Sequence, residues 1–278
     1  MCRRTFLKSA AVLAAPALSH AQSTQRKGRL KQAVTRGCFG RKMAFEDMLR
    51  HAARLGFEGF DLVRAPDLGL VKKYGLAPSM VSGAGSIADN MNHKEFHEKL
   101  EPLLRASIRA AAEAGAPNVI VLSGNRRGLS DEEGMQNCLT FLKKVIPEAE
   151  DRGVTLCMEL LNSKVNHPDY QCDRTVWGVE LCKRVNSPRM KLLYDIYHMQ
   201  IMEGDVIRTI RNNLPFIAHF HTAGNPGRHE MDDTQELNYR GIARAIADSG
   251  FQGYVAHEYS PQGDPLESLE KAYKLFEV

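Results

Sequence analysis

Residues 190–222 read MKLLYDIYHMQIMEGDVIRTIRNNLPFIAHFHT and carry the pattern that decides the fold. An apolar run at 190–197 predicts a buried strand, residues 205–212 have the apolar spacing of a helix, and a second apolar run at 217–222 predicts another strand. Two buried strands joined by a helix form the parallel unit of α/β proteins. The stretch therefore predicts parallel strands covered by helices.

The same alternation continues in both directions along the chain. The other predicted strands are 32–39, 59–63, 77–82, 118–123, 154–161 and 253–259. The other predicted helices are 45–55, 68–74, 94–114, 131–151, 176–185, 239–249 and 265–276. Several of these helices end at a glycine, as at Gly56, Gly115 and Gly250, the residue that most readily takes the left-handed conformation after a helix.

Eight strands, each followed by a helix, predict an α/β fold, a single (β/α)8 TIM barrel over residues 29–278. A chain of 278 residues with 43% hydrophobic and 25% charged residues is long enough for one such barrel. An open doubly wound sheet would usually carry a glycine-rich phosphate loop after its first strand, and the segment GCFG at 37–40 is not one. Active sites of barrels lie at the carboxyl ends of the strands, so polar residues there are candidates for function.

The first 28 residues read as a separate segment, an export signal peptide followed by a polar linker. Arg3 and Arg4 precede a short apolar run at 9–18 and a small-residue end at 19–21, a pattern typical of cleaved signals. The paired arginines predict export to the periplasm by the twin-arginine route, although Cys2 stands where that pattern usually has Ser or Thr. The apolar run is shorter than the roughly 20 residues that cross a bilayer, so we expect no stable membrane insertion.

The charge of the remaining chain excludes one class of partner. The formal net charge is +4, but without Arg3, Arg4 and Lys8 the body has 34 basic against 33 acidic residues. A near-neutral body gives no electrostatic argument for nucleic-acid binding, so we expect a small-molecule substrate and no nucleic acid, with a homo-oligomer left open.

Five cysteines lie outside the leader and none has CxxC spacing. Buried free thiols are the favoured interpretation, with one disulfide left open by export.

Four late strands each end with a residue type that binds metals. They are Glu159, Asp195, His221 and Glu258, each inside an otherwise apolar run. In a barrel these side chains converge, and three buried carboxylates together imply a cation or protonation. We therefore expect a divalent metal. Three carboxylates and one imidazole favour Mn²⁺ or Mg²⁺, with Co²⁺ or Zn²⁺ as alternatives.

A longer motif indicates a family. The run YDIYHMQIMEGDV at 194–206, with NPGRHE at 225–230 and ELNY at 236–239, resembles the hydroxypyruvate isomerases, within the xylose isomerase-like TIM-barrel family of sugar isomerases and epimerases. The similarity extends from about residue 31 to 261 by the order of elements and is dense from 159 to 258. It implies a metal-dependent isomerase of a small hydroxycarbonyl acid, most simply hydroxypyruvate to tartronate semialdehyde.

The resemblance also implies roles for individual residues. It implies a metal held by Glu159, Asp195, His221 and Glu258, with the two glutamates also serving as the acid/base pair.

Substrate contacts are implied at three further positions. The resemblance implies that His198 and Arg228 contact substrate oxygens, and we expect Asn162 to belong to the same substrate-binding site. His219 can share a strand face with His221 and lie deeper under the site.

The chain departs from the close relatives in the site region. They typically have Gln where this chain has His221, and His at that position is usual in the ketose-epimerase branch. They have Glu-Pro at the fifth strand, where this chain has Glu159-Leu160, and EPGTGE where it has EMDDTQE at 230–236. These differences leave a ketose 3-epimerase or keto-sugar epimerase as the alternative function.

The chemistry itself allows both outcomes. Moving a carbonyl between adjacent carbons requires removal of a carbon-bound proton and stabilisation of an enediolate, for which a metal supplies Lewis acidity and a glutamate the base. A zinc-dependent apurinic-site endonuclease shares the barrel but needs a multinuclear His-rich site, and we find no matching ligands in the early strands. A non-catalytic sugar-binding barrel is disfavoured because both glutamates are present.

Overall fold

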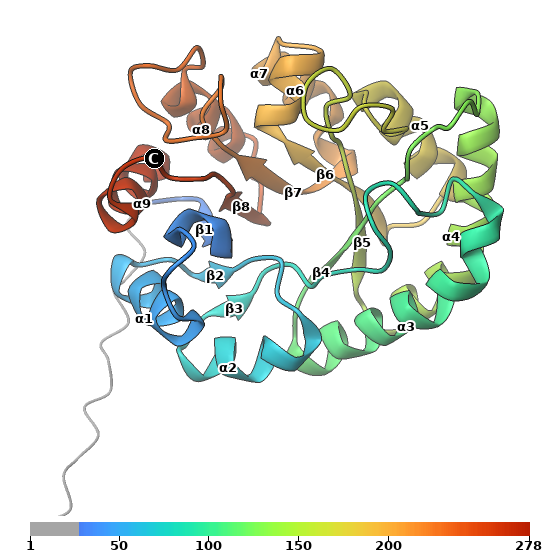
Figure 1. The fold of residues 1–278 in the computed structure, drawn as a ribbon, viewed down its shortest axis with the longest axis horizontal. Helices are drawn as coiled ribbons and strands as arrows, with labels where there is room; N and C mark the ends of the chain where they lie inside the picture. The colour runs from blue at the N-terminus through green and yellow to red at the C-terminus, as the bar shows by residue number, and fades with distance from the viewer. Residues whose placement is uncertain (1–27) are drawn as a thin grey trace, which may run out of the picture.

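A ring of eight parallel strands forms the centre of the molecule, and the helices lie outside it (Figure 1). The computed structural model describes residues 28–278, so the predicted export peptide lies outside the described residues. The strands are β1 (Lys31–Val34), β2 (Gly59–Phe60), β3 (Ala77–Pro78), β4 (Asn118–Val121), β5 (Thr155–Glu159), β6 (Met190–Asp195), β7 (Ile217–Thr222) and β8 (Tyr254–His257). The helices are α1 (Phe45–Leu55), α2 (Leu68–Lys73), α3 (His97–Ala114), α4 (Asp131–Asp151), α5 (Thr175–Val185), α6 (Ile196–Met202), α7 (Val206–Asn213), α8 (Tyr239–Asp248) and α9 (Pro265–Phe276).

The strand order closes the ring. The hydrogen-bonded order is β3-β2-β1-β8-β7-β6-β5-β4, and every neighbouring pair is parallel. Val81, just past β3, joins the two ends: its N–H donates to the Asn118 carbonyl at 2.9 Å, and its carbonyl accepts the Ile120 N–H at 3.0 Å. Since closure leaves no free sheet edge, the predicted (β/α)8 barrel is confirmed.

The helices begin and end where local chemistry places their caps. At α4, the Ser130 Oγ accepts the Glu133 N–H at 3.2 Å while the Glu133 carboxylate accepts the Ser130 N–H at 3.0 Å, a reciprocal capping box. Helix α1 ends at Gly56, whose φ of 97° is strained for any residue with a side chain. The predicted bounds of α1, α4 and α9 are confirmed to the residue.

Two layers of apolar side chains hold the ring and the helices together. The larger core lies between the strands and the helices, and a small inner cluster of Met80, Cys157 and Leu193 lies apart from it.

The five cysteines among residues 28–278 are free and buried, in keeping with the prediction of buried thiols. Within the same residues, no helix combines the length and hydropathy needed to cross a bilayer.

Three strand predictions were wrong by three or more residues at one end. The predicted strand 32–39 ends at Val34 and is followed by the 3-10 helix η1 (Arg36–Phe39), because the chain turns through a Cys38 N–H bond to the Thr35 carbonyl. The predicted strands 59–63 and 77–82 shorten to the two-residue β2 and β3. A further helix, α6, begins directly after β6 because the Asp195 carboxylate accepts the His198 N–H at 3.1 Å and caps it.

Candidate active site

The four predicted metal ligands meet at the carboxyl ends of β5–β8. Glu159 and Asp195 are the last residues of β5 and β6, His221 is the second-last of β7, and Glu258 directly follows β8. One ligand atom from each lies within 4.8 Å of the others. The barrel therefore brings the four predicted residues together, as the ends of its late strands converge.

A local irregularity brings two of these residues level. The register between β6 and β7 shifts between Leu192 and Leu193, so that Leu192 pairs with Ile217 but Leu193 pairs with His219. One extra residue, Ala218, is thereby accommodated on β7, and Asp195 pairs with His221. Because side chains alternate along a strand, an unshifted register would have put Phe220 opposite Asp195.

His221 stands at the centre of the acidic cluster. Its Nδ1 lies 2.8 Å from Glu258 Oε2 and 3.4 Å from Glu159 Oε1. The imidazole is fully buried, and Nδ1 has no hydrogen bond of good geometry. A buried ring nitrogen without a directed partner, facing carboxylate oxygens, is a donor arrangement that a divalent cation completes.

The surroundings of the three carboxylates shift their pKa values in different directions. Burial raises the pKa of Glu159, and the nearby Glu258 and Asp195 charges add to this rise. Burial also raises the pKa of Asp195, against the charge of Arg228. Burial acts on Glu258 in the same direction, but the charge that His221 carries when its ring is protonated and the charge of Arg228 outweigh it and lower the pKa of Glu258. A cation among the three carboxylates would favour the charged form of each.

The donor set fits a hard or borderline divalent ion. Three carboxylates and one imidazole suit Mn²⁺ or Mg²⁺ better than a structural zinc site, which would use thiolates or more histidines. The residues that would hold the ion are thus Glu159, Asp195, His221 and Glu258.

His198 lies beside the cluster in a fixed tautomer. Its Nδ1 accepts the Asn162 backbone N–H at 3.2 Å and lies 2.6 Å from Asn162 Nδ2. The ring proton is therefore on Nε2, which lies 3.6 Å from Asp195 Oδ2 and makes no hydrogen bond. This leaves a buried N–H donor at the site. Burial also lowers the pKa of His198, so the ring is neutral at pH 7.

Asn162 lies behind His198 rather than facing open space. It is fully buried, and its Oδ1 accepts the N–H groups of Val165 and Asn166 at 3.0 and 2.8 Å. Its amide nitrogen, Nδ2, bonds Asn166 Oδ1 and His198 Nδ1, so every polar group of the Asn162 side chain has a hydrogen-bond partner. The arrangement makes Asn162 an orienting partner of His198.

Arg228 reaches into the cluster from the loop after β7. Its Nη2 lies 2.7 Å from Glu258 Oε2 and 3.3 Å from Asp195 Oδ2, and its guanidinium lies over the Tyr197 ring at 5.4 Å from the centroid. Burial lowers the pKa of Arg228, but the Glu258 and Asp195 charges outweigh this and raise it. The arginine therefore stays charged and can donate to an anionic substrate group.

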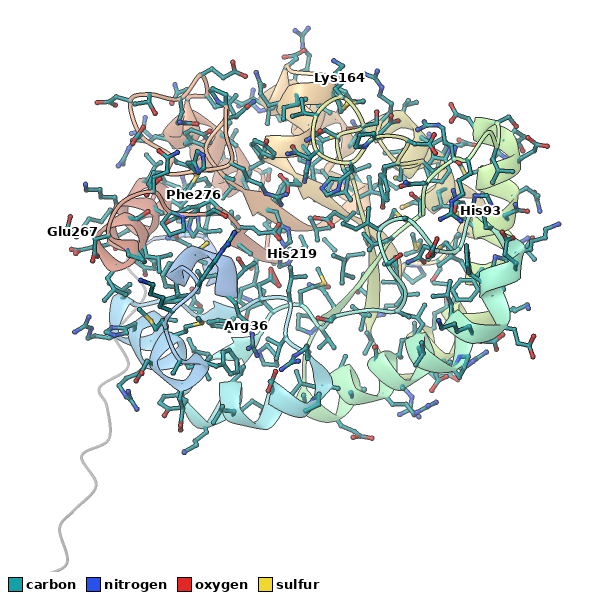
Figure 2. The ribbon with its side chains drawn as sticks, in the orientation of Figure 1. Arg36, His93, Lys164, His219, Glu267 and Phe276 are labelled. Carbon is teal, nitrogen blue, oxygen red and sulfur yellow. The ribbon has the colours of Figure 1, made fainter. Side chains whose placement is uncertain are left out.

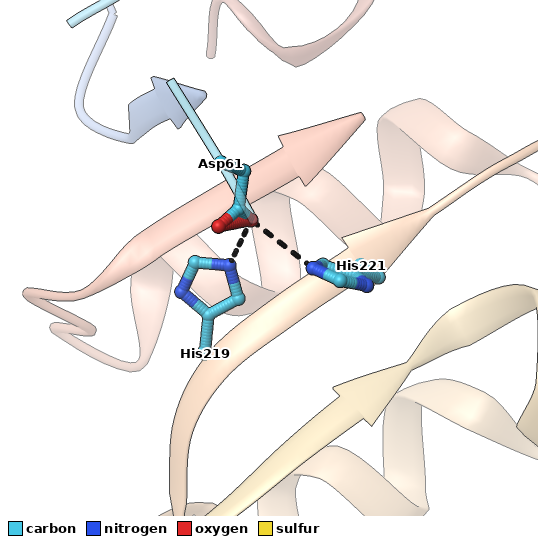
Figure 3. A group of neighbouring side chains, drawn as sticks. All are labelled: Asp61, His219 and His221. Atoms are coloured by element: carbon cyan, nitrogen blue, oxygen red, sulfur yellow. Dashed lines mark hydrogen bonds and ion pairs between the residues drawn. The ribbon is translucent and has the colours of Figure 1, made fainter. Parts of the chain in front are cut away.

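Sequence reasoning missed Asp61, which directly follows β2 (Figure 3). Its Oδ2 accepts from His219 Nε2 at 2.7 Å and from His221 Nε2 at 3.1 Å, and all three side chains are fully buried. The expectation that the early strands offer no matching ligands was therefore wrong, because Asp61 forms a metal-type cluster with the two histidines. The available signal was a lone carboxylate in the apolar run GFDLV at 59–63, the pattern already used for β5–β8.

An open cavity of about 370 Å³ adjoins the cluster. The residues that line it include Thr35, Arg36, Asp61, Arg228, Glu258 and Ser260. Figure 2 labels Arg36, on the 3-10 helix after β1, and His219, on β7. Because Glu258 both lines the cavity and belongs to the four-residue cluster, the cavity lies at the same end of the barrel as the cluster, and it has the size of a small-molecule site.

Comparisons with known proteins agree with this arrangement. The model of the xylose isomerase-like TIM barrel family matches residues 49–277. A putative hydroxypyruvate isomerase of Xenopus laevis is 29% identical over 171 residues, which cover 60% of this chain and 62% of the relative. A 2-oxo-tetronate isomerase of Cupriavidus necator is 36% identical over 121 residues, covering 44% of this chain and 46% of the relative. The chain thus spans less than two thirds of these relatives.

Solved structures share the fold. One titled AP endonuclease, family 2, from Brucella melitensis has a TM-score of 0.76 at 24% identity, covering 86% of this chain and 97% of its own. D-psicose 3-epimerase from Clostridium cellulolyticum H10 has a TM-score of 0.73 at 16% identity, covering 90% of this chain and all of its own. At these identities the likeness concerns the fold alone.

Proposed function

This chain belongs to the xylose isomerase-like TIM barrel family, and from that membership we propose that it is a divalent-metal-dependent isomerase of a small hydroxycarbonyl acid. The observation that carries the proposal is the meeting of Glu159, Asp195, His221 and Glu258 within 4.8 Å. The substrate we favour is hydroxypyruvate, converted to tartronate semialdehyde, since relatives are named hydroxypyruvate isomerase and 2-oxo-tetronate isomerase.

The bound cation, Mn²⁺ or Mg²⁺ in this proposal, supplies Lewis-acid stabilisation of the negative charge that develops on the substrate oxygens. Glu159 and Glu258 exchange the carbon-bound proton with the two neighbouring carbons, one acting as base and the same or the other returning it. Both carboxylates lie against His221 Nδ1, so a substrate placed there has a base within reach.

The other polar groups of the site bind and orient the substrate. The buried Nε2–H of His198 donates to a substrate oxygen, and the charged fork of Arg228 pairs with the carboxylate of an acid substrate. Asn162 keeps the His198 proton on Nε2 through its own bond to Nδ1.

A second candidate is a ketose 3-epimerase or keto-sugar epimerase. Two glutamates beside one imidazole allow proton removal and return at a single carbon as well as between neighbours. The shared barrel with D-psicose 3-epimerase is compatible with this outcome. An apurinic-site endonuclease has less support, because the near-neutral net charge of the body gives no electrostatic argument for DNA binding.

The test is a substrate panel with the Mn²⁺-loaded, full-length protein. Hydroxypyruvate, 2-oxo-tetronate, free ketoses and 3-keto sugars are compared by kcat/KM. The proposal expects the highest value for one of the two acids. A ketose or keto sugar ranking first would support the epimerase alternative, and turnover of none of them would contradict both.

We also propose that the protein is exported to the periplasm. The support is the leader alone, with Arg3 and Arg4 ahead of a short apolar run. Changing both arginines to lysine is expected to leave the precursor in the cytoplasm. Unchanged secretion of this variant would contradict the twin-arginine route.

A further inference from the structure

A buried acid and two buried histidines form a hydrogen-bonded group at the base of the site (Figure 3). Asp61 Oδ2 lies 2.7 Å from His219 Nε2 and 3.1 Å from His221 Nε2, and none of the three side chains is exposed to solvent. Burying a carboxylate is costly unless hydrogen bonds compensate it. The group therefore needs an explanation beyond packing.

The hydrogen bonds fix where the protons are. Asp61 Oδ1 accepts the backbone N–H of Leu62 at 3.0 Å, which leaves Oδ2 facing both histidines. A carboxylate oxygen only accepts, so both Nε2 atoms must carry a proton. His219 agrees with this, since its other nitrogen, Nδ1, has no partner and an unpaired acceptor is the milder case.

The consequence falls on His221. With its Nε2–H held by Asp61, only Nδ1 is free to act as a ligand, and Nδ1 is the atom beside Glu159 and Glu258. Metal-binding histidines generally donate their second N–H to a carboxylate, which fixes the ring orientation and tautomer.

We propose that Asp61 is a positioning residue, which holds His221 as the Nε2–H tautomer and so presents Nδ1 to the cation, while His219 holds Asp61 in place. The inference rests on the metal-dependent function proposed above and extends it to β2, on the opposite side of the barrel from β6. A second cation shared by Asp61, His219 and His221 is the competing arrangement, and the experiment below separates the two.

Asp61→Asn is the informative substitution. The Leu62 N–H requires an acceptor at the Oδ1 position, so the new amide oxygen takes that place and the NH₂ group faces both histidines. An NH₂ donor demands unprotonated Nε2 atoms, which moves the His221 proton to Nδ1 and removes the ligand. Asp61→Asn keeps the shape of the side chain and thus acts by changing which nitrogen of His221 carries the proton. An Asp→Asn change has this effect in enzymes where an acid orients a catalytic histidine.

The first experiment measures Mn²⁺ affinity by calorimetry on the full-length protein. Asp61→Asn is expected to weaken binding about 10- to 100-fold. The matched control is Ser79→Ala, which removes another buried contact at the same strand end, the 3.1 Å bond to the Phe60 carbonyl, without touching a histidine. The control is expected to bind within about twofold of wild type. Equal affinity of Asp61→Asn and wild type would overturn the inference.

The second experiment needs no substitution at position 61. Long-range ¹H–¹⁵N spectra of the Mg²⁺-saturated wild type, with His221 assigned by comparison with His221→Gln, report which ring nitrogen carries the proton. A proton on Nε2 is expected. A proton on Nδ1, or about two ions bound per chain, would contradict the positioning role. If wild type binds no divalent ion at all, the proposed function itself fails, so the two failures are distinguishable.

Discussion

The two halves of the barrel are built differently. In the late half, β5–β8 have four to six residues each, and each strand ends at or next to a ligand of the acidic cluster. In the early half, β2 and β3 have only two residues each. There the chain leaves the sheet early, and residues such as Thr35, Arg36 and Asp61 line the cavity.

Holding metal ligands and lining a substrate cavity place different requirements on a strand. Ligands on neighbouring strands must lie at a common level, and strand pairing fixes that level. The register shift between β6 and β7 places Asp195 opposite His221. A substrate cavity requires room instead, which short strands and early turns provide. Asp61, from the early half, bonds one of the predicted ligands, His221.

The largest expected effect is on turnover, from the late-half glutamates. Glu159→Gln and Glu258→Gln keep an oxygen ligand and the side-chain volume but remove the base. Each is expected to lower kcat about 10²- to 10⁴-fold while retaining appreciable Mn²⁺, because general acid–base catalysis typically contributes that much. Steady-state kinetics with parallel metal analysis provide the check. Full activity in either variant would remove that glutamate from the mechanism.

All direct ligands of the metal are expected to come from the late half, so only late-half substitutions should lower the metal content. Wild type should hold about one divalent ion per chain, as a single site of this composition does. The double variant Glu159→Ala with Asp195→Ala should hold close to none. The early-half control Asp67→Ala, which removes an acid paired with Arg36 and Arg64, should keep the wild-type stoichiometry. Elemental analysis decides, and an unchanged ion count in the double variant would refute the site.

The junction of the halves supplies a pH test. Burial lowers the pKa of His257 on β8 to about 3, while its Nε2 bonds Gln32 on β1 at 3.0 Å. The unfolded chain takes up this proton near pH 6.5, whereas the folded chain takes it up only near pH 3. The folded state therefore loses about 1.4 kcal/mol of unfolding free energy per pH unit as the pH falls through that window.

His257→Gln should remove this contribution and keep a donor to Gln32. Urea denaturation at pH 7, 6 and 5 measures the difference in slope between the variant and wild type. Parallel curves for the two proteins would show that His257 is not held neutral.

The smallest expected effect is on KM, from Arg36 on the early-half side of the cavity. Arg36 lines the cavity and Arg64 does not, although both pair with Asp67 Oδ2, at 2.6 and 3.0 Å. For an acid substrate, Arg36→Ala should raise KM about two- to fivefold, since a partly exposed charge pair contributes under about 1 kcal/mol. Arg64→Ala should leave KM unchanged. Equal effects of the two variants would mean that the change acts through Asp67.

Local sequence signals explain what could be predicted. Helix α4 had its capping box at Ser130 and Glu133, and α1 had its terminal Gly56, so their bounds followed from the sequence. The four ligands stood out because each polar residue closed a long apolar run. Asp61 was missed because the apolar run around it, at 59–63, is shorter than the runs that carry the four predicted ligands. Helix α6 was missed because its cap, Asp195, also ends a strand. The extra residue in β7 depends on pairing with β6, which no single segment reveals.

Proton transfer between substrate carbons by Glu159 and Glu258 can be measured directly. The most direct measurement incubates the Mn²⁺-loaded protein with hydroxypyruvate in D₂O and follows the products by NMR. The account predicts solvent deuterium at C2 of the tartronate semialdehyde and at C3 of recovered hydroxypyruvate, with both signals lost in Glu159→Gln and Glu258→Gln. Turnover that places no solvent deuterium in product or recovered substrate, even after many turnovers, would indicate hydride transfer between the carbons and would contradict proton transfer by the glutamates.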